Sequence, residues 1–108
     1  WQACRLGEFL LLRERVDEAA PFIVVGTGRV VESCSRAPDD AMQRAAVQTL
    51  VPWGCEELVK VGHQDTARRI RQEALLVLHP VVEANPDNES LKKVLAVILA
   101  IRVEDHLN

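Results

Sequence analysis

The sequence predicts an all-α fold, either an antiparallel bundle or a helical-repeat stack of about five helices. Turn-forming residues are few along the 108 residues, and the segments between them run to roughly twenty residues, much longer than ordinary strands. Within these segments the apolar residues return every third or fourth position, which is the spacing of one face of a helix. Aromatic residues make up only 4% of the chain, so the core has to be built from aliphatic side chains.

The first two predicted helices cover residues 2–15 and 17–36. The middle of the second, residues 22–28, combines β-branched side chains with two glycines and is therefore also compatible with a strand. We favour a helix, because the sequence offers no second strand to pair with it and a lone strand would leave its backbone groups unsatisfied. In a helix, Gly26 and Gly28 would permit a neighbouring helix to approach closely.

The third predicted helix runs from residue 41 to about residue 61. Asp40 can cap its first turn, and Gln43 stands at the partner position of a capping box. Pro52 predicts a kink or a break near the middle, because proline has no N–H group to donate. Gly62 is expected to end the helix as a C-cap glycine.

The fourth predicted helix begins near Asp65 and ends before Pro86, with a kink at Pro80. Its apolar residues recur at helical spacing, and residues 75–78 are apolar on every side of the helix. This half of the helix is therefore expected to lie at the centre of the fold.

The fifth predicted helix begins after Asp87 and Asn88, either of which can cap it, and runs to about His106. It contains eight consecutive apolar residues, 94–101. A helix that is apolar on every side is buried on every side or covered by a partner, and burial within the domain is our first interpretation. The second interpretation is an interface formed by Val94, Ile98 and Ile101.

Two family resemblances fit this class of fold. Gly62, Ala74 and Pro86 resemble the pattern of a tetratricopeptide repeat, with small residues at two packing points and proline after the second helix, although Leu58 stands where that family has an aromatic residue. The turn at residues 61–65 and the long helix after it resemble the inter-helix turns of vinculin and α-catenin bundles. The second resemblance implies adhesion or cytoskeletal scaffolding, without an active site. Stacks of the HEAT and armadillo type are a further alternative.

The composition limits the classes of function. The net charge of −3 gives no general attraction to nucleic acid or to anionic lipid. The sequence shows no signal peptide and no apolar stretch long enough for membrane insertion. The three cysteines have no short spacing, which is typical of reduced thiols in a cytoplasmic protein. Because the chain opens with Trp1, we expect a single helical domain, residues 1–108, taken from a longer protein.

Catalysis, cofactors and metal binding are not expected. No two of the three histidines stand four residues apart, and no cysteine pair has the spacing of zinc ligands. Cys34 and Cys55 fall on predicted helices, and we interpret them as buried structural thiols rather than nucleophiles. His79, in an apolar helix, is interpreted as partly buried. Residues 26–28 lack both the third glycine of a dinucleotide fingerprint and the lysine of a phosphate loop.

Five polar or aromatic residues are candidates for contact with a partner. Trp53 is expected to be a core residue, with an exposed contact residue as the second interpretation. Lys60 is expected to pair with Glu56, four residues before it. The most concentrated basic group could be a solvated helix face, or a docking site for an acidic peptide, an acidic helix or a phosphate. Its members are Lys60, Arg68, Arg69 and Arg71.

The sequence therefore predicts a protein–protein interaction or scaffold domain that presents a helical surface or groove to a protein partner. The first alternative is a homo-oligomerisation domain, in the simplest case a homodimer, that assembles through the last two helices. A small enzyme or regulatory subunit that depends on cysteine and histidine ranks below both.

Overall fold

The computed structural model describes residues 16–103 of the protein. Within this range the chain forms helices joined by short turns and no strand, which confirms the all-α prediction. The first predicted helix, residues 2–15, lies outside the described residues. The helices are α2 (Val16–Arg36), α3 (Ala41–Lys60), α4 (Gln64–Ala84) and α5 (Glu89–Leu99).

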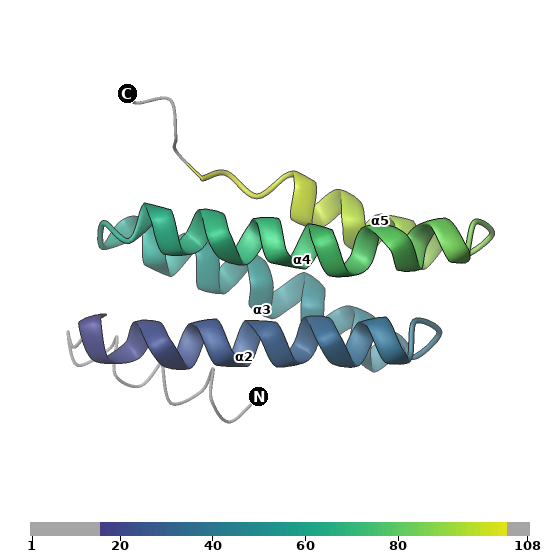
Figure 1. Ribbon diagram of the computed structural model, residues 1–108, viewed down its shortest axis with the longest axis horizontal. Helices are drawn as coiled ribbons and strands as arrows, with labels where there is room; N and C mark the ends of the chain where they lie inside the picture. The colour runs from purple at the N-terminus through teal and green to yellow at the C-terminus, as the bar shows by residue number, and fades with distance from the viewer. Residues whose placement is uncertain (1–15, 104–108) are drawn as a thin grey trace.

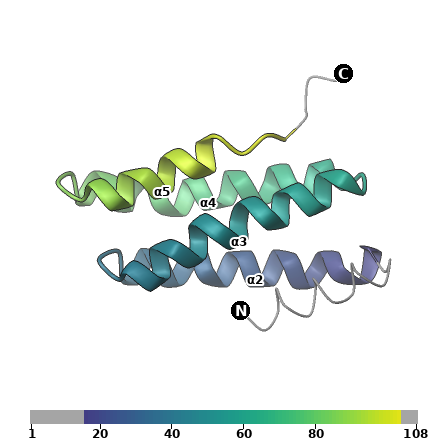
Figure 2. The same ribbon diagram turned by 180° about the vertical axis from the view of Figure 1, so that it is seen from behind.

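The four helices form two layers (Figures 1 and 2). Helices α2 and α4 lie in one layer, and α3 and α5 lie behind them in the other. The fold measures 42 × 34 × 15 Å along its principal axes, and the smallest dimension fits two layers whose helix axes lie about 8–10 Å apart. Helix α3 packs against α2, α4 and α5, and α4 packs against α2, α3 and α5. Helices α2 and α5 share no substantial contact, so they form opposite edges of the fold.

Helix α2 settles the ambiguous segment of residues 22–28, which is helical throughout. The buried hydroxyl of Thr27 donates to the carbonyl of Ile23 at 2.8 Å, so a polar group in the core is satisfied within its own helix. The expectation of a close approach at Gly28 is wrong, because Gly28 is exposed and a Cβ there would meet nothing within 4 Å. Gly26 is buried, and a close approach there stays a prediction. A close approach does lie at Gly54 of α3, where a Cβ would come within 2.9 Å of the Cγ2 atom of Ile23.

The start of helix α3 confirms the predicted cap. The carboxylate of Asp40 accepts hydrogen bonds from the backbone N–H groups of Met42 at 2.8 Å and Gln43 at 3.3 Å. The predicted break at Pro52 is absent, because α3 continues through this residue to Lys60.

The end of helix α3 confirms the predicted C-cap. Gly62 has a φ of 91°, in the left-handed region that side chains other than glycine rarely adopt. Its N–H group donates to the carbonyl of Val59 at 3.1 Å, and the N–H group of His63 donates to the carbonyl of Leu58 at 2.8 Å. This pair of bonds is the Schellman motif, which satisfies the last carbonyls of α3 and turns the chain into α4.

Helix α5 is shorter than predicted. It ends at Leu99 rather than near residue 106, and residues 101–103 are not helical. The N–H group of Ile101 donates to the carbonyl of Ile98 at 3.1 Å, which tightens the last turn. A side chain of α4 also contributes, since Nη2 of Arg71 donates to the carbonyl of Leu99 at 3.3 Å. A residue 28 positions earlier in the chain thus satisfies a carbonyl at the end of this helix.

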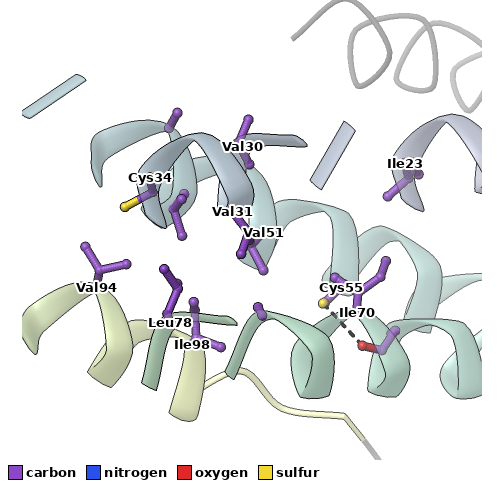
Figure 3. Packing of buried hydrophobic residues seen from close by; sticks show 14 of the residues in the cluster. Ile23, Val30, Val31, Cys34, Val51, Cys55, Ile70, Leu78, Val94 and Ile98 are labelled. Atoms are coloured by element: carbon purple, nitrogen blue, oxygen red, sulfur yellow. Dashed lines mark hydrogen bonds between the residues drawn. The ribbon is translucent and has the colours of Figure 1, made fainter. Parts of the chain in front are cut away.

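The core is formed by one apolar stripe from each helix. Figure 3 shows aliphatic and thiol side chains of α2, α3, α4 and α5 meeting in one interior. The stripe of α4 has the three- and four-residue spacing that the sequence predicted. Its fully or nearly fully buried members are Ala67, Ile70, Ala74 and Leu78.

The second pair of helices repeats the register of the first. Helices α2 and α4 end at residues 36 and 84, which are 48 residues apart. Helices α3 and α5 begin at residues 41 and 89, again 48 apart. We call α2 with α3 the first hairpin and α4 with α5 the second hairpin.

The turns inside the two hairpins have the same construction. The N–H group of Asp40 donates to the carbonyl of Ala37 at 3.0 Å, and that of Asn88 donates to the carbonyl of Asn85 at 3.0 Å. Both Asp40 and Asn88 then cap the following helix with a side-chain oxygen, which confirms the predicted cap at Asn88. The turns also touch, because Nδ2 of Asn88 donates to the carboxylate of Asp39 at 3.0 Å.

Candidate functional site

An apolar groove runs along the edge of the fold between α4 and α5. Its volume is 350 Å³, and five of its seven lining residues are apolar. Leu76 is 70% exposed and Leu99 is 53% exposed, and these are large apolar side chains to leave in water. We call this feature the edge groove. Its lining residues are Gln72, Leu75, Leu76, His79, Pro80, Leu95 and Leu99.

The edge groove exists because α4 carries more apolar residues than its neighbours can cover. Leu78 is fully buried and Leu75 is partly buried, whereas Leu76 and Val77 are exposed. The expectation that residues 75–78 lie at the centre of the fold is therefore wrong for two of the four. Among the described residues, the neighbours of α4 cover the side of Leu78 and leave that of Leu76 open.

The rim of the edge groove carries one ion pair. Nδ1 of His79 lies 3.6 Å from a carboxylate oxygen of Glu83. The side chain of His79 is 61% exposed, so the interpretation of this residue as partly buried is wrong. With Gln72 it places polar atoms on an otherwise apolar surface, where they can fix the orientation of a bound partner.

Most of the predicted basic cluster is already engaged within the chain. Nζ of Lys60 donates to Glu57 at 3.0 Å rather than to the predicted Glu56, and this bond raises the pKa of Lys60. Arg68 pairs with Asp65 at 2.8 Å. Arg71 donates to the carbonyl at the end of α5, as described above.

These bonds weaken the case for a basic docking surface. Arg69 is exposed, but Lys60, Arg68 and Arg71 would each have to exchange an acceptor of the chain for one of a partner. Such an exchange gains little, because exposed ion pairs are worth about 0–1 kcal/mol.

The burial of two of its residues contradicts the second interpretation of the last helix, an interface formed by Val94, Ile98 and Ile101. Val94 and Ile98 are fully buried in the core, so neither side chain is available to a partner. Ile101 is partly buried and packs against the same core. Trp53 is also partly buried against the core, which confirms the first of its two interpretations.

The sequence pattern identified the two helices that carry exposed apolar side chains, but not the face of each helix on which these side chains lie. Leu99 belongs to the apolar run 94–101 and Leu76 to the run 75–78, and both runs carried the signal of surplus apolar surface. Sequence spacing alone does not distinguish Leu99 from Ile98, its buried neighbour.

The described thiols are structural. Cys34 and Cys55 are free and fully buried, as predicted. Burial raises the pKa of both, and that of Cys55 reaches about 11. The thiol of Cys55 lies 3.5 Å from the carbonyl of Ala67 and links α3 to α4 (Figure 3). Since the thiolate is the nucleophile, such groups are poorly suited to covalent catalysis.

We expect the burial of Cys55 to make the stability of the domain pH-dependent. In the unfolded chain the thiol ionises near its ordinary pKa of 9.0, whereas in the folded chain its pKa is about 11. The stabilisation is therefore complete below pH 9 and is lost as the pH rises towards 11. The free energy of unfolding should fall by up to about 1.4 kcal/mol per pH unit in this window. Urea unfolding at pH 8 to 11 measures this slope.

The matched control is Cys55→Ala, which removes one of the two described thiols whose pKa is raised by burial and should make the slope between pH 9 and 11 shallower. Peptide mapping after treatment with N-ethylmaleimide gives a second measurement. Modification of Cys55 in the folded domain at pH 8, as fast as in urea, would contradict the assignment of a buried thiol.

Two other hollows are less suited to a partner. One, of 670 Å³, lies beside the Pro-Asp turns and is lined by Asp39, Arg44 and residues 84–90. Its polar groups already bond within the chain, since Arg44 donates to the carbonyl of Pro38 at 2.8 Å and Asn88 donates to the carboxylate of Asp39 at 3.0 Å. The other, of 310 Å³, lies between α2 and α4 and carries the carboxylates of Glu32 and Glu73.

The residues 16–103 hold no group of three histidine, cysteine, aspartate or glutamate side chains placed to bind a metal ion. In the same part of the chain, no helix combines the length and the apolar character needed to cross a bilayer. No protein-family model, no curated protein and no solved structure matches this chain.

Proposed function

We propose that this chain is a protein–protein interaction and scaffold domain that binds a protein partner at the edge groove. The exposure of Leu76 and Leu99 on the two sides of a concave apolar surface is the observation that carries this proposal. Partner sites are commonly mainly apolar, with a few polar groups that set orientation, and the edge groove has this composition. The free, buried thiols suit a reducing compartment, so the domain is proposed to work in the cytoplasm.

We also propose a helical-repeat stack rather than a closed bundle. In a closed four-helix bundle the first and last helices pack together, whereas α2 and α5 share no substantial contact. The shared register of the two hairpins supports a stack in which each unit contacts its neighbour. The spacing of 48 residues is longer than the 34 of a tetratricopeptide repeat and closer to the roughly 40–47 of HEAT and armadillo units.

Homo-oligomerisation is the second candidate function. The observation that favours it is that Leu76 and Leu99 lie on the last two helices, the pair from which the sequence predicted assembly. Light scattering on the purified domain distinguishes the two functions, because a monomer up to about 100 μM would exclude a stable dimer at working concentrations.

Replacing Leu76 and Leu99 together by Asp is expected to abolish capture of the partner without unfolding the domain. Both side chains are exposed, so the charges stay in water, while the apolar surface of the groove is lost. Recovery of the partner from a cell lysate should fall at least about tenfold, as for the loss of central contact residues. Quantitative mass spectrometry measures the recovery, and circular dichroism checks that the fold is intact.

The matched control is Met42→Asp, because Met42 is 77% exposed on α3 and lies outside the edge groove. Met42→Asp also makes the net charge more negative, by one charge, and this variant should capture the same proteins as the wild type. Equal capture by the wild type and the Leu76→Asp/Leu99→Asp variant would refute a partner site at this groove.

A further inference from the structure

The edge groove has a counterpart inside the fold. The two hairpins are 48 residues apart in the sequence. Subtracting 48 from the number of each α4 residue of the edge groove gives an α2 residue that lines the hollow between α2 and α4. These residues are Val24, Thr27, Gly28, Val31 and Glu32. Its two α5 positions, Leu95 and Leu99, fall on Val47 and Val51 of α3, which are fully buried in the core that α4 completes. The edge groove is therefore the surface of the second hairpin that corresponds to the seat of α4 on the first.

The first hairpin buries this surface and the second leaves it open. Val51 is fully buried, whereas Leu99, its counterpart, is 53% exposed. Helix α4 makes the difference, since it packs against both α2 and α3. Among the described residues, no helix packs against both α4 and α5 in the way that α4 packs against α2 and α3.

We propose that the edge groove binds an amphipathic helix of a partner protein, seated on α4 and α5 as α4 is seated on α2 and α3. This inference rests on the proposed function and names the partner of the same site. Helices α2 and α4 run in the same direction, so the bound helix runs parallel to α4 (Figure 1). Its contact stripe follows the spacing of the stripe that α4 turns towards the first hairpin. We call this set the α4 stripe: it consists of Ala67, Ile70 and Ala74, which are buried in the core, and Val77, which is 40% exposed and lines the hollow shared with α2.

Volume decides the kind of side chain that fits. Leu76 stands where the first hairpin has Gly28, and Leu99 stands where it has Val51. The larger side chains of the second hairpin fill part of the space that α4 fills in the first. A close-packed contact therefore requires small residues, such as alanine, where the partner helix crosses Leu76.

Polarity adds a second requirement. Gln72 and His79 stand where the first hairpin has Val24 and Val31. A helix that covers these polar groups must offer them hydrogen-bond partners, because a buried polar group without one costs about 1–3 kcal/mol. The stripe of the partner helix is thus apolar at its centre and polar where it meets Gln72 and His79.

A second copy of this chain does not supply that helix. The α2 residues that correspond to the α4 stripe are Ala19, Phe22, Gly26 and Arg29. Ala19 and Gly26 are already buried, and Arg29 places a charge where the stripe has Val77. Ala67 and Ala74 of α4 are also buried. Two copies that met groove to groove would bring two concave surfaces together and leave the 350 Å³ of each unfilled. We therefore take a helix of a partner protein as the occupant, and a second copy is one of the outcomes of the test below.

A synthetic helix with the α4 stripe tests this inference. The probe is a fluorescein-labelled 21-residue peptide with the sequence of residues 64–84, and the reference peptide carries Ile70→Asp and Val77→Asp in that sequence. Fluorescence anisotropy measures binding to the full chain. We expect the wild type and Met42→Asp to bind the probe equally, and Leu76→Asp/Leu99→Asp to bind it at least tenfold more weakly. The reference peptide should bind at least tenfold more weakly than the probe.

Methyl NMR locates the contact independently, since the methyl signals of Leu76 and Leu99 should shift when the probe is added. Failure of the probe to bind, or equal binding by Leu76→Asp/Leu99→Asp, would overturn the inference. If partner capture from the lysate still depends on Leu76 and Leu99, the proposed function stands and its occupant is not a helix of this kind. If neither experiment depends on them, both proposals fail. A dimer that dissociates on Leu76→Asp/Leu99→Asp would replace the partner helix by a second copy.

Discussion

Replacing Ile98 by Asp is expected to unfold the domain rather than to weaken contact with a partner. Ile98 is fully buried and lies in the core with residues of all four helices. The substitution removes an aliphatic side chain and places a carboxylate among the apolar side chains of the core. The two effects together should lower the free energy of unfolding by about 4 kcal/mol or more. The free energy of unfolding of an ordinary domain is about 5–15 kcal/mol, so the folded population should fall sharply.

The neighbouring residue provides the control. Leu99→Asp introduces the same charge one position later, at a side chain that is 53% exposed, and should change the free energy of unfolding by less than about 1 kcal/mol. Chemical denaturation followed by circular dichroism measures both variants. Equal stability of the two variants would contradict the burial of Ile98, and Ile98 would again be a candidate for contact with a partner.

The second large effect is expected at Gly54, where α3 crosses α2. A Cβ at this position would lie 2.9 Å from Cγ2 of Ile23 and 3.1 Å from Cγ2 of Thr27. Both neighbours are β-branched and stiff at χ1, so neither can move aside easily. Gly54→Val adds two further methyl groups to this contact and should lower the free energy of unfolding by about 3 kcal/mol.

Gly28→Val is the matched control for this prediction. Gly28 is exposed in the middle of α2, and a Cβ there would meet nothing within 4 Å. Removing a glycine from a helix is mildly favourable, so this variant should be as stable as the wild type or more stable by up to about 0.5 kcal/mol. Thermal or urea unfolding of the pair gives the comparison. A Gly54→Val domain as stable as Gly28→Val would show that the helices have room to separate.

Helix boundaries were predictable where a capping residue or a turn glycine marks them in the sequence. The second helix was expected to end at residue 36 and ends at Arg36, and the fourth was expected to begin near Asp65 and begins at Gln64. These limits depend on local chemistry such as the cap at Asp40 and the positive φ of Gly62. The end of α5 carries no such signal, and there the prediction was wrong.

The sequence carries one local sign of the shared register of the two hairpins. The segments 37–40 and 85–88 both contain Pro-Asp followed by a capping residue, and they stand 48 residues apart. Similarity confined to one turn is weak until the helices before the turns are known to end 48 residues apart and the helices after them to begin 48 residues apart. The helix bounds supplied that confirmation.

The sequence by itself determined the class of the fold, the caps and turns, and the surplus of apolar residues on the last two helices. Only the tertiary structure decided which of those residues face the core. Leu76 and Leu78 belong to the same apolar run, two positions apart, yet one is 70% exposed and the other fully buried. Capping and turn preferences act between neighbours along the chain and can be read from it. Burial depends on which helix lies across from a side chain, and that is set by the packing of α2, α3, α4 and α5 together.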